Sequence, residues 1–139
     1  MGQNYVDWNE KYSVGINEID KQHKKLLDFT NDLYNACGKG KDDANELFKV
    51  TIKKAVDYVH THFAYEENLM KQYNYPDYII HKKQHEEFIR KILEEVKKFQ
   101  TGALFVPNSF VRFLRDWTLE HIAIVDKKYQ KHLNNCGVN

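Results

Sequence analysis

Seven polar side chains recur at helical spacing within stripes of apolar residues, where the core of a helical protein would normally be apolar. Burying a polar group costs on the order of several kcal/mol unless a partner satisfies it. Imidazole and carboxylate groups are common ligands of transition metals, so a pair of metal ions would satisfy all of these groups together. The candidate metal ligands are His23, His62, Glu66, His81, His85, His121 and Asp126.

The spacing of these ligands indicates how helices would present them. Two pairs lie four residues apart and would therefore share one face of a helix. These pairs are His62 with Glu66 and His81 with His85. The third pair, His121 and Asp126, lies five residues apart, and an α-helix rotates such residues by about 140°. Either the Asp126 side chain reaches sideways or the helix contains a local π-turn. We expect the sideways reach.

Three breaks divide the chain into four predicted helices. Proline is favoured in the first turn of a helix, so Pro76 and Pro107 each indicate a helix start. The third break is Gly38-Lys39-Gly40, after which Asp42 or Asp43 would be the N-cap. The predicted helices span residues 19–37, 42–72, 76–100 and 107–133, after an irregular arm over residues 1–18.

Each predicted helix carries an apolar stripe at spacings of three and four residues, and the candidate ligands lie on these stripes. Short connections make consecutive helices antiparallel, which predicts an all-α, up-down-up-down four-helix bundle. Counting about 1.5 Å of rise per residue brings all seven ligands into one half of this bundle. In the fourth helix, the expected inward stripe is Phe110, Leu114, Trp117, His121 and Ile124.

The remaining histidines and the two cysteines have structural interpretations. His60 lies beside a stripe position and His132 lies near the chain end, so we expect both at the surface. Cys37 and Cys136 fall at opposite ends of the predicted bundle, whereas a disulfide needs Cα atoms within about 7 Å. An intramolecular disulfide would therefore require the C-terminal tail to fold far back along the bundle, and an intermolecular one stays open. The arm offers four apolar side chains for packing, namely Trp8, Tyr12, Val14 and Ile16.

Composition limits the possible functions. The chain has 139 residues, 42% of them hydrophobic, and a net charge of +1, which fits one soluble domain over residues 1–139. A near-neutral charge gives no basis for nucleic-acid binding. No apolar run approaches the roughly 18 residues of a membrane span, and the polar N-terminus does not resemble a signal peptide. We therefore expect a cytoplasmic protein, monomeric or weakly oligomeric, without membrane or nucleic-acid partners.

The number of ligands exceeds what one ion needs, and their chemistry suits iron. Zinc usually takes four ligands, whereas imidazole combined with carboxylate suits iron. Two six-coordinate irons offer twelve positions, of which five histidines fill five and two bridging carboxylates fill four. A bridging oxide or hydroxide takes two more, so one position stays open. A small ligand such as O2 would bind at that position.

The ligand set also favours ligand binding over oxidation chemistry. Carboxylate-rich di-iron oxidases use Glu-x-x-His motifs, and this chain contains none. A neutral, histidine-rich shell stabilises high-valent iron poorly. We therefore expect a binding protein rather than an enzyme, with oxidase or peroxidase activity at most a minor property and no catalytic residue assigned.

Four stretches of the sequence resemble the hemerythrin family, and most of all its single-domain bacteriohemerythrins. They are VGINEIDKQHKKL, HFAYEENLM, HKKQH and DWTLEHIAIVDKKY, which together extend from Val14 to Tyr129. The resemblance therefore covers nearly the whole chain, and every ligand of the family motifs is present.

The resemblance implies a role for each matching position. His81, His85 and His121 would hold one iron, and Glu66 and Asp126 would bridge it to the second. The second iron would be held by His23 and His62 and would carry the open position. An apolar O2 pocket over that position would be lined by Leu26, Phe63, Trp117 and Ile122. The implied function is reversible O2 binding for transport, storage or scavenging, with nitric oxide or small anions such as azide as other ligands.

Three alternatives remain open from the sequence. The same di-iron site could read O2, nitric oxide or redox state as a sensor or stress protein. It could catalyse a reaction, as a peroxidase or nitric oxide reductase does. The bundle could instead be a metal-free helical interaction protein, which iron analysis would test.

Overall fold

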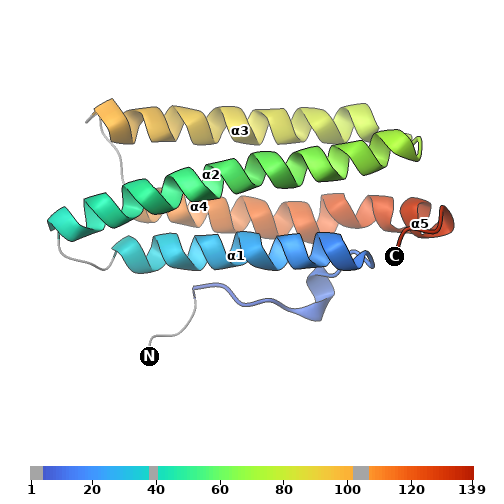
Figure 1. Cartoon of the computed structure of the whole chain (residues 1–139), viewed down its shortest axis with the longest axis horizontal. Coiled ribbons are helices and arrows are strands. Elements are labelled where there is room, and N and C mark those ends of the chain that lie inside the picture. Colours follow the sequence, from blue (N-terminus) through green and yellow to red (C-terminus); the bar gives the residue numbers. More distant parts are fainter. Residues whose placement is uncertain (1–4, 38–40, 102–106) are drawn as a thin grey trace.

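The chain forms a four-helix bundle in the computed structural model, which describes residues 5–37, 41–101 and 107–139. Side chains are described from residue 46 onward in the second range. Each helix runs antiparallel to the one before it in the chain, and the fourth is a continuous rod made of three segments (Figure 1). The predicted all-α bundle is confirmed. The helices are α1 (Asn17–Cys37), α2 (Lys41–Gln72), α3 (Tyr78–Thr101), α4 (Pro107–Glu120), the π-helix η2 (His121–Asp126) and α5 (Lys127–Asn135).

The helix boundaries differ from the predicted ones by a few residues. Pro107 begins α4 as predicted, but α3 begins at Tyr78, and Pro76 lies in the turn before it. The turn follows from Asn74, which has a φ of 54°, a left-handed conformation that commonly ends a helix. The prediction of Asp42 or Asp43 as the N-cap of the second helix is wrong, because α2 already begins at Lys41 and both aspartates lie within its first turn.

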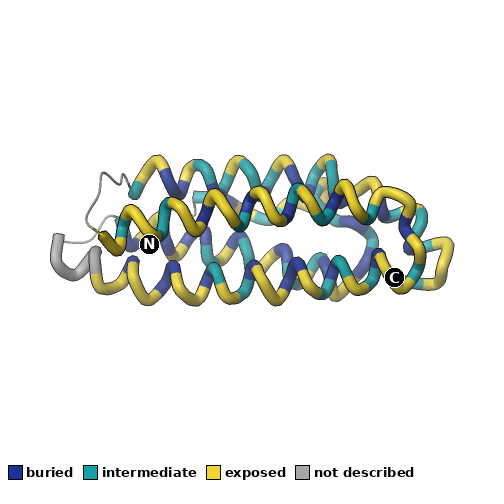
Figure 2. The backbone as a smooth tube through the Cα atoms, turned by 90° about the horizontal axis from the view of Figure 1, so that it is seen from above, coloured by how far each residue is buried: buried dark blue, intermediate teal, exposed yellow. Residues whose placement is uncertain are grey.

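Buried residues line the interior of the bundle along its length (Figure 2). They form two apolar clusters. One includes Phe48, Ile52, Phe88, Ile92 and Phe110, and the other includes Ile16, Ile19, Met70, Tyr129 and Leu133. Along the bundle, the candidate ligands lie between these two clusters. Apolar packing therefore supports the ligand residues on both sides.

The fourth helix contains a π-helical segment, which corrects the expected sideways reach of Asp126. The segment runs from His121 to Asp126, so the five-residue spacing is accommodated by the backbone. Hydrogen bonds from residue i to i+5 put an extra residue into the turn and bring residues five apart together. The inward prediction for Ile124 is wrong for the same reason: its side chain is 56% exposed, whereas Ile122 is 2% exposed.

The N-terminal arm runs alongside α1 (Figure 1). Of the predicted packing residues, Val14 and Ile16 are buried, whereas Trp8 and Tyr12 are half-buried. Asp20 accepts hydrogen bonds from the Ser13 hydroxyl at 2.5 Å and the Val14 amide at 2.8 Å. The arm also contains a short 3-10 helix, η1 (Glu10–Tyr12), which contacts η2.

The arm makes a second connection further along α1 and a third to α5. Asn31, buried in α1, donates to the Val6 carbonyl and accepts from the Val6 amide, each at 2.8 Å. The side chain of Asn134 donates to the carbonyl of Gly15 at 3.1 Å. Gly15 has a φ of 69°, a left-handed conformation that favours glycine, and a Cβ there would also lie 2.4 Å from the end of the Gln130 side chain.

The two cysteines are free and lie at opposite ends of the bundle, as the topology predicts. Cys37 ends α1, and Cys136 follows α5 (Figure 1). Among the described residues, no helix combines the length and the apolar character needed to span a membrane.

Candidate metal centre

All seven predicted ligands meet in the interior of the bundle. One comes from α1, two each come from α2 and α3, and two come from η2, so every helix of the bundle contributes. Each is at most 5% exposed. They are His23 on α1, His62 and Glu66 on α2, His81 and His85 on α3, and His121 and Asp126 on η2.

The first group of ligands contains three histidines and one carboxylate. The Nε2 atom of His121 lies 3.1 Å from that of His85 and 3.2 Å from that of His81. Asp126 Oδ1 lies 2.9 Å from His81 Nε2 and 3.0 Å from His121 Nε2. Adjacent ligands of an octahedral ion with bonds of about 2.1 Å would be roughly 3 Å apart. The spacing of these four atoms therefore fits one octahedral ion.

The second group contains two histidines and shares its carboxylates with the first group. His23 Nε2 lies 3.1 Å from Asp126 Oδ2 and 3.5 Å from Glu66 Oε1, which also contacts His62 Nε2. The other oxygen of each carboxylate faces the first group: Asp126 Oδ1 contacts His81 and His121, and Glu66 Oε2 lies 3.7 Å from His81 Nε2. Both carboxylates are therefore placed to bridge two ions.

Several of these buried atoms have no hydrogen-bond partner among the described residues. They include both ring nitrogens of His23 and all four carboxylate oxygens of Glu66 and Asp126. Buried polar groups are normally satisfied, and two carboxylates also bring negative charge into a low-dielectric interior. Two metal ions would satisfy His23 Nε2 and the four carboxylate oxygens and would balance the charge, so the residues present fit a dinuclear metal site.

The pKa values show the same demand for positive charge. Burial alone would raise the pKa of both carboxyl groups, but the surrounding histidines hold the pKa of Asp126 and of Glu66 well below the usual range. Burial lowers the pKa of His23, yet Asp126 and Glu66 together outweigh it and raise that pKa to about 9. The two carboxylates therefore favour positive charge beside them.

Two of the ligand histidines are oriented by contacts at Nδ1, the ring nitrogen that faces away from the centre, with residues that the sequence analysis missed. His62 Nδ1 lies 2.7 Å from Gln22 Oε1, and His85 Nδ1 lies 2.9 Å from Glu67 Oε2. Each partner oxygen accepts a hydrogen bond from the Nδ1–H group of its histidine, which leaves Nε2 free to bind a metal. Gln22 and Glu67 each stand next to a predicted ligand in the sequence, but that adjacency alone does not show which histidine they contact.

A small apolar cavity adjoins the ligands. It has a volume of about 20 Å³, and its lining includes all four predicted pocket residues, Leu26, Phe63, Trp117 and Ile122, together with His23, His62, His121 and Asp126. A water molecule needs about 10–15 Å³ of such volume, so the cavity admits one very small molecule. The Phe63 ring stacks on His85 with centroids 3.7 Å apart, and Trp117 stacks on His121 at 4.4 Å.

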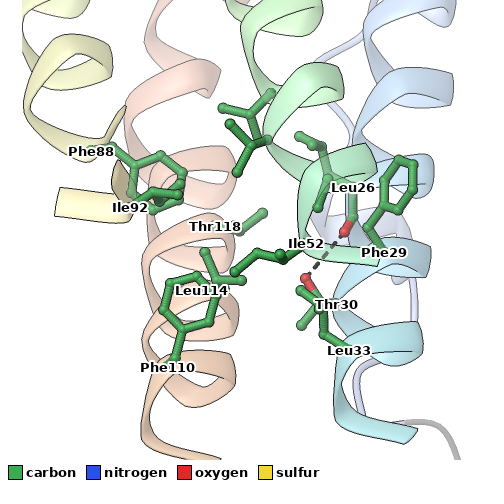
Figure 3. Close-up of a pocket in the computed structure, with 13 residues that line it drawn as sticks. Leu26, Phe29, Thr30, Leu33, Ile52, Phe88, Ile92, Phe110, Leu114 and Thr118 are labelled. Atoms are coloured by element: carbon green, nitrogen blue, oxygen red, sulfur yellow. Dashed lines mark hydrogen bonds between the residues drawn. The ribbon is translucent and has the colours of Figure 1, made fainter. Parts of the chain in front are cut away.

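A second cavity of about 30 Å³ continues away from the ligands into the apolar half of the bundle (Figure 3). It shares Leu26, Val59, Phe88 and Thr118 with the first cavity. The hydroxyl of Thr30, which also lines it, donates to the Leu26 carbonyl at 3.1 Å and is thereby satisfied (Figure 3). The interior beside the ligands is therefore mostly apolar and contains two small voids.

The two histidines outside the centre differ from each other. His60 is exposed, as predicted. His132 is half-buried, which corrects its assignment to the surface: its Nε2 donates to the Tyr73 carbonyl at 2.6 Å, and its ring lies beside Tyr75. It therefore connects α5 to the turn between α2 and α3.

Comparison with known proteins identifies the family. The hemerythrin HHE cation binding domain matches residues 14–133, which include all seven ligands. The chain belongs to the hemerythrin family. Proteins of this family bind non-heme iron and typically bind O2 at that iron. The predicted family membership is confirmed.

Individual hemerythrin relatives match over most of the chain. A bacteriohemerythrin of Pseudomonas aeruginosa is 37% identical over 125 residues, covering 90% of this chain and 79% of the relative. A bacteriohemerythrin of Methylococcus capsulatus is 33% identical, covering 86% of this chain and 88% of the relative. A crystal structure of wild-type hemerythrin superposes with a TM-score of 0.87 at 30% identity, covering 93% of this chain and 98% of that one.

Proposed function

We propose that the chain is a non-heme di-iron protein that binds O2 reversibly at an open position on one iron. His81, His85 and His121 would hold the first iron, and His23 and His62 the second, with Glu66, Asp126 and an oxide or hydroxide as bridges. The observation that carries the proposal is the apolar cavity of about 20 Å³, which is lined by both histidines of the less fully ligated group.

The surrounding side chains support reversible binding. The irons would supply the electrons that hold O2, and the chain's own residues control what else reaches the site. Leu26, Phe63, Trp117 and Ile122 line the cavity and offer no acidic group, so they limit the access of water and protons. Bound O2 needs protons to leave as a reduced product. When few protons reach the site, that loss is slow and release as O2 is favoured.

The test is anaerobic reduction of the iron-loaded protein, followed by O2 titration and then by removal of O2. We expect two irons per chain by metal analysis and an absorbance change that reverses when O2 is removed. Fewer than two irons per chain, or a one-way conversion to ferric protein without a reversible step, would overturn the proposal.

The finer aspects of the function remain predictions. O2 transport, storage or scavenging, a cytoplasmic location and a monomeric or weakly associating state all stay as predicted from the sequence. Sedimentation of the iron-loaded protein tests the oligomeric state. A partner captured in only one oxidation state would favour the sensor alternative over carriage.

A further inference from the structure

The two ends of the metal centre are supported by side chains of different charge. His85, at the three-histidine end, is 1% exposed, and its Nδ1 faces the carboxylate of Glu67, which is 19% exposed. His62, at the two-histidine end, has its Nδ1 against the amide oxygen of Gln22. The two groups therefore differ by one negative charge immediately behind a ligand.

The position of Glu67 follows from helix geometry. Glu66 and Glu67 are neighbours on α2, and consecutive helical residues point about 100° apart. Glu66 enters the centre and contacts His62 and His23, whereas Glu67 reaches across to α3 and accepts from His85 at 2.9 Å. The His85 imidazole therefore faces the metal centre with its Nε2 atom and the Glu67 carboxylate with its Nδ1 atom.

The orientation of the Gln22 amide is fixed by a second contact. Its Nε2 donates to Glu18 Oε1 at 3.1 Å, so its Oε1 is the atom that faces His62. The charge of Glu18 therefore contacts His62 only through a neutral amide. Gln22 orients the His62 ring without adding a negative charge to it.

A carboxylate behind a ligating histidine makes the imidazole a stronger donor and attracts a more highly charged ion. A neutral amide also orients the ring, but it increases the donor strength of the imidazole much less and attracts a highly charged ion much less. We propose that Glu67 and Gln22 are positioning residues that make the two ends of the centre unequal, so that oxidation is favoured at the end held by His81, His85 and His121. This inference rests on the proposed function, because it requires iron in both groups.

The test uses variants that separate the effect of the carboxylate charge from the effect of having a hydrogen-bond acceptor behind the histidine. Glu67→Gln keeps an acceptor for His85 Nδ1 but removes the charge, and Glu67→Ala removes both. The exchange Glu18→Gln with Gln22→Glu places a carboxylate behind His62 and keeps the net charge of the protein. Glu86→Gln is the matched control, because it removes the same charge from an exposed position beside His85 in the sequence.

The readouts are the midpoint reduction potential of the iron-loaded protein and the rate of iron release to a chelator. We expect Glu67→Gln to raise the potential and the Glu18/Gln22 exchange to lower it, while Glu86→Gln matches the wild type. Iron affinity should fall by about 10–100-fold in Glu67→Ala, which should appear as faster iron release to the chelator.

Two results would overturn the inference while leaving the proposed function intact. In the first, all variants match the wild type in potential and in iron release. In the second, Glu67→Gln matches the wild type and only Glu67→Ala differs, which would show that position alone matters. A wild-type protein that does not take up two irons per chain would instead contradict the proposed function itself.

Discussion

Two pairs of ligands show different ways in which one helix can present two side chains to the same ion. His81 and His85 lie on α3 at the four-residue spacing of a regular α-helix. His121 and Asp126 lie five residues apart, and the fourth helix becomes a π-helix between them. The first pair is positioned by regular geometry, and the second is positioned by a local change of geometry. Regular spacing can be read from a sequence, whereas a local change is only one of several ways to satisfy an irregular spacing.

Single-residue deletions should separate the two pairs most strongly. Deleting Lys83 would rotate the rest of α3 by about 100° and turn Phe88 away from the core. Deleting Ile124, whose side chain is exposed, would turn η2 into an α-helical turn and bring His121 and Asp126 to four-residue spacing. We expect the Lys83 deletion to abolish metal binding and cooperative unfolding, and the Ile124 deletion to preserve the helical bundle.

Circular dichroism, thermal unfolding and metal content measure both deletions. The comparison fails if the Ile124 deletion is as damaging as the Lys83 deletion. That result would mean that the π-helix is required for the fold and is more than a means of placing Asp126.

Removing one ligand from each pair should affect the two groups differently. Asp126 contributes an oxygen to each group, whereas His85 belongs to the three-histidine group alone. We expect Asp126→Ala to weaken the binding of both ions, by more than about 100-fold, because ligand loss exceeds the effect of losing a residue behind a ligand. His85→Ala should leave one ion bound. Equal iron content in the two variants would contradict the bridging role of Asp126.

The pH dependence of the metal-free protein should report the charge that the ions would otherwise supply. The folded-state pKa of His23 is raised to about 9 and that of His81 is also raised, so their contribution to stability is complete below pH 6.5 and is lost as the pH rises toward 9. The pKa values of Glu66 and Asp126 are lowered, so their contribution is lost as the pH falls below about 4.

Thermal unfolding of the metal-free protein between pH 4 and 9.5 tests this expectation. The melting temperature should decline above pH 6.5, and His23→Gln should show a smaller decline over the same range. A melting temperature that rises between pH 6.5 and 9 would contradict the assigned role of His23.

The smallest expected effect concerns the cavity wall. Ile122, on the π-helix, lines the cavity beside the ligands, whereas Ile19, which is equally buried, lies in the apolar cluster at the end of the bundle. Ile122→Val and Ile19→Val should each cost about 0.5–1.5 kcal/mol of stability. Only Ile122→Val should accelerate the oxidation of the iron-loaded protein in air. Equal oxidation rates would show that the cavity does not limit water access.

The sequence was sufficient for the features that depend on regular spacing. Prolines and glycines marked the helix breaks, three- and four-residue spacing placed the ligands on the inward stripes, and the helical rise per residue brought them into one half of the bundle. It was not sufficient where the choice depends on neighbouring helices. The exposure of Ile124 depends on the π-helix, and the half-burial of His132 depends on the turn at Tyr73. The pairing of His85 with Glu67 depends on how α2 and α3 lie against each other.

The two small cavities in the bundle have a consequence for the effect of hydrostatic pressure. Unfolding eliminates internal voids, so the unfolded chain together with its water occupies less volume than the folded protein, and pressure favours unfolding. The cavities of about 30 Å³ and about 20 Å³ adjoin each other within the core. The part of the bundle around them should therefore be more compressible than the apolar cluster that includes Ile19 and Leu133. A dissolved apolar gas that fills them would remove the void and raise the pressure at which the bundle unfolds.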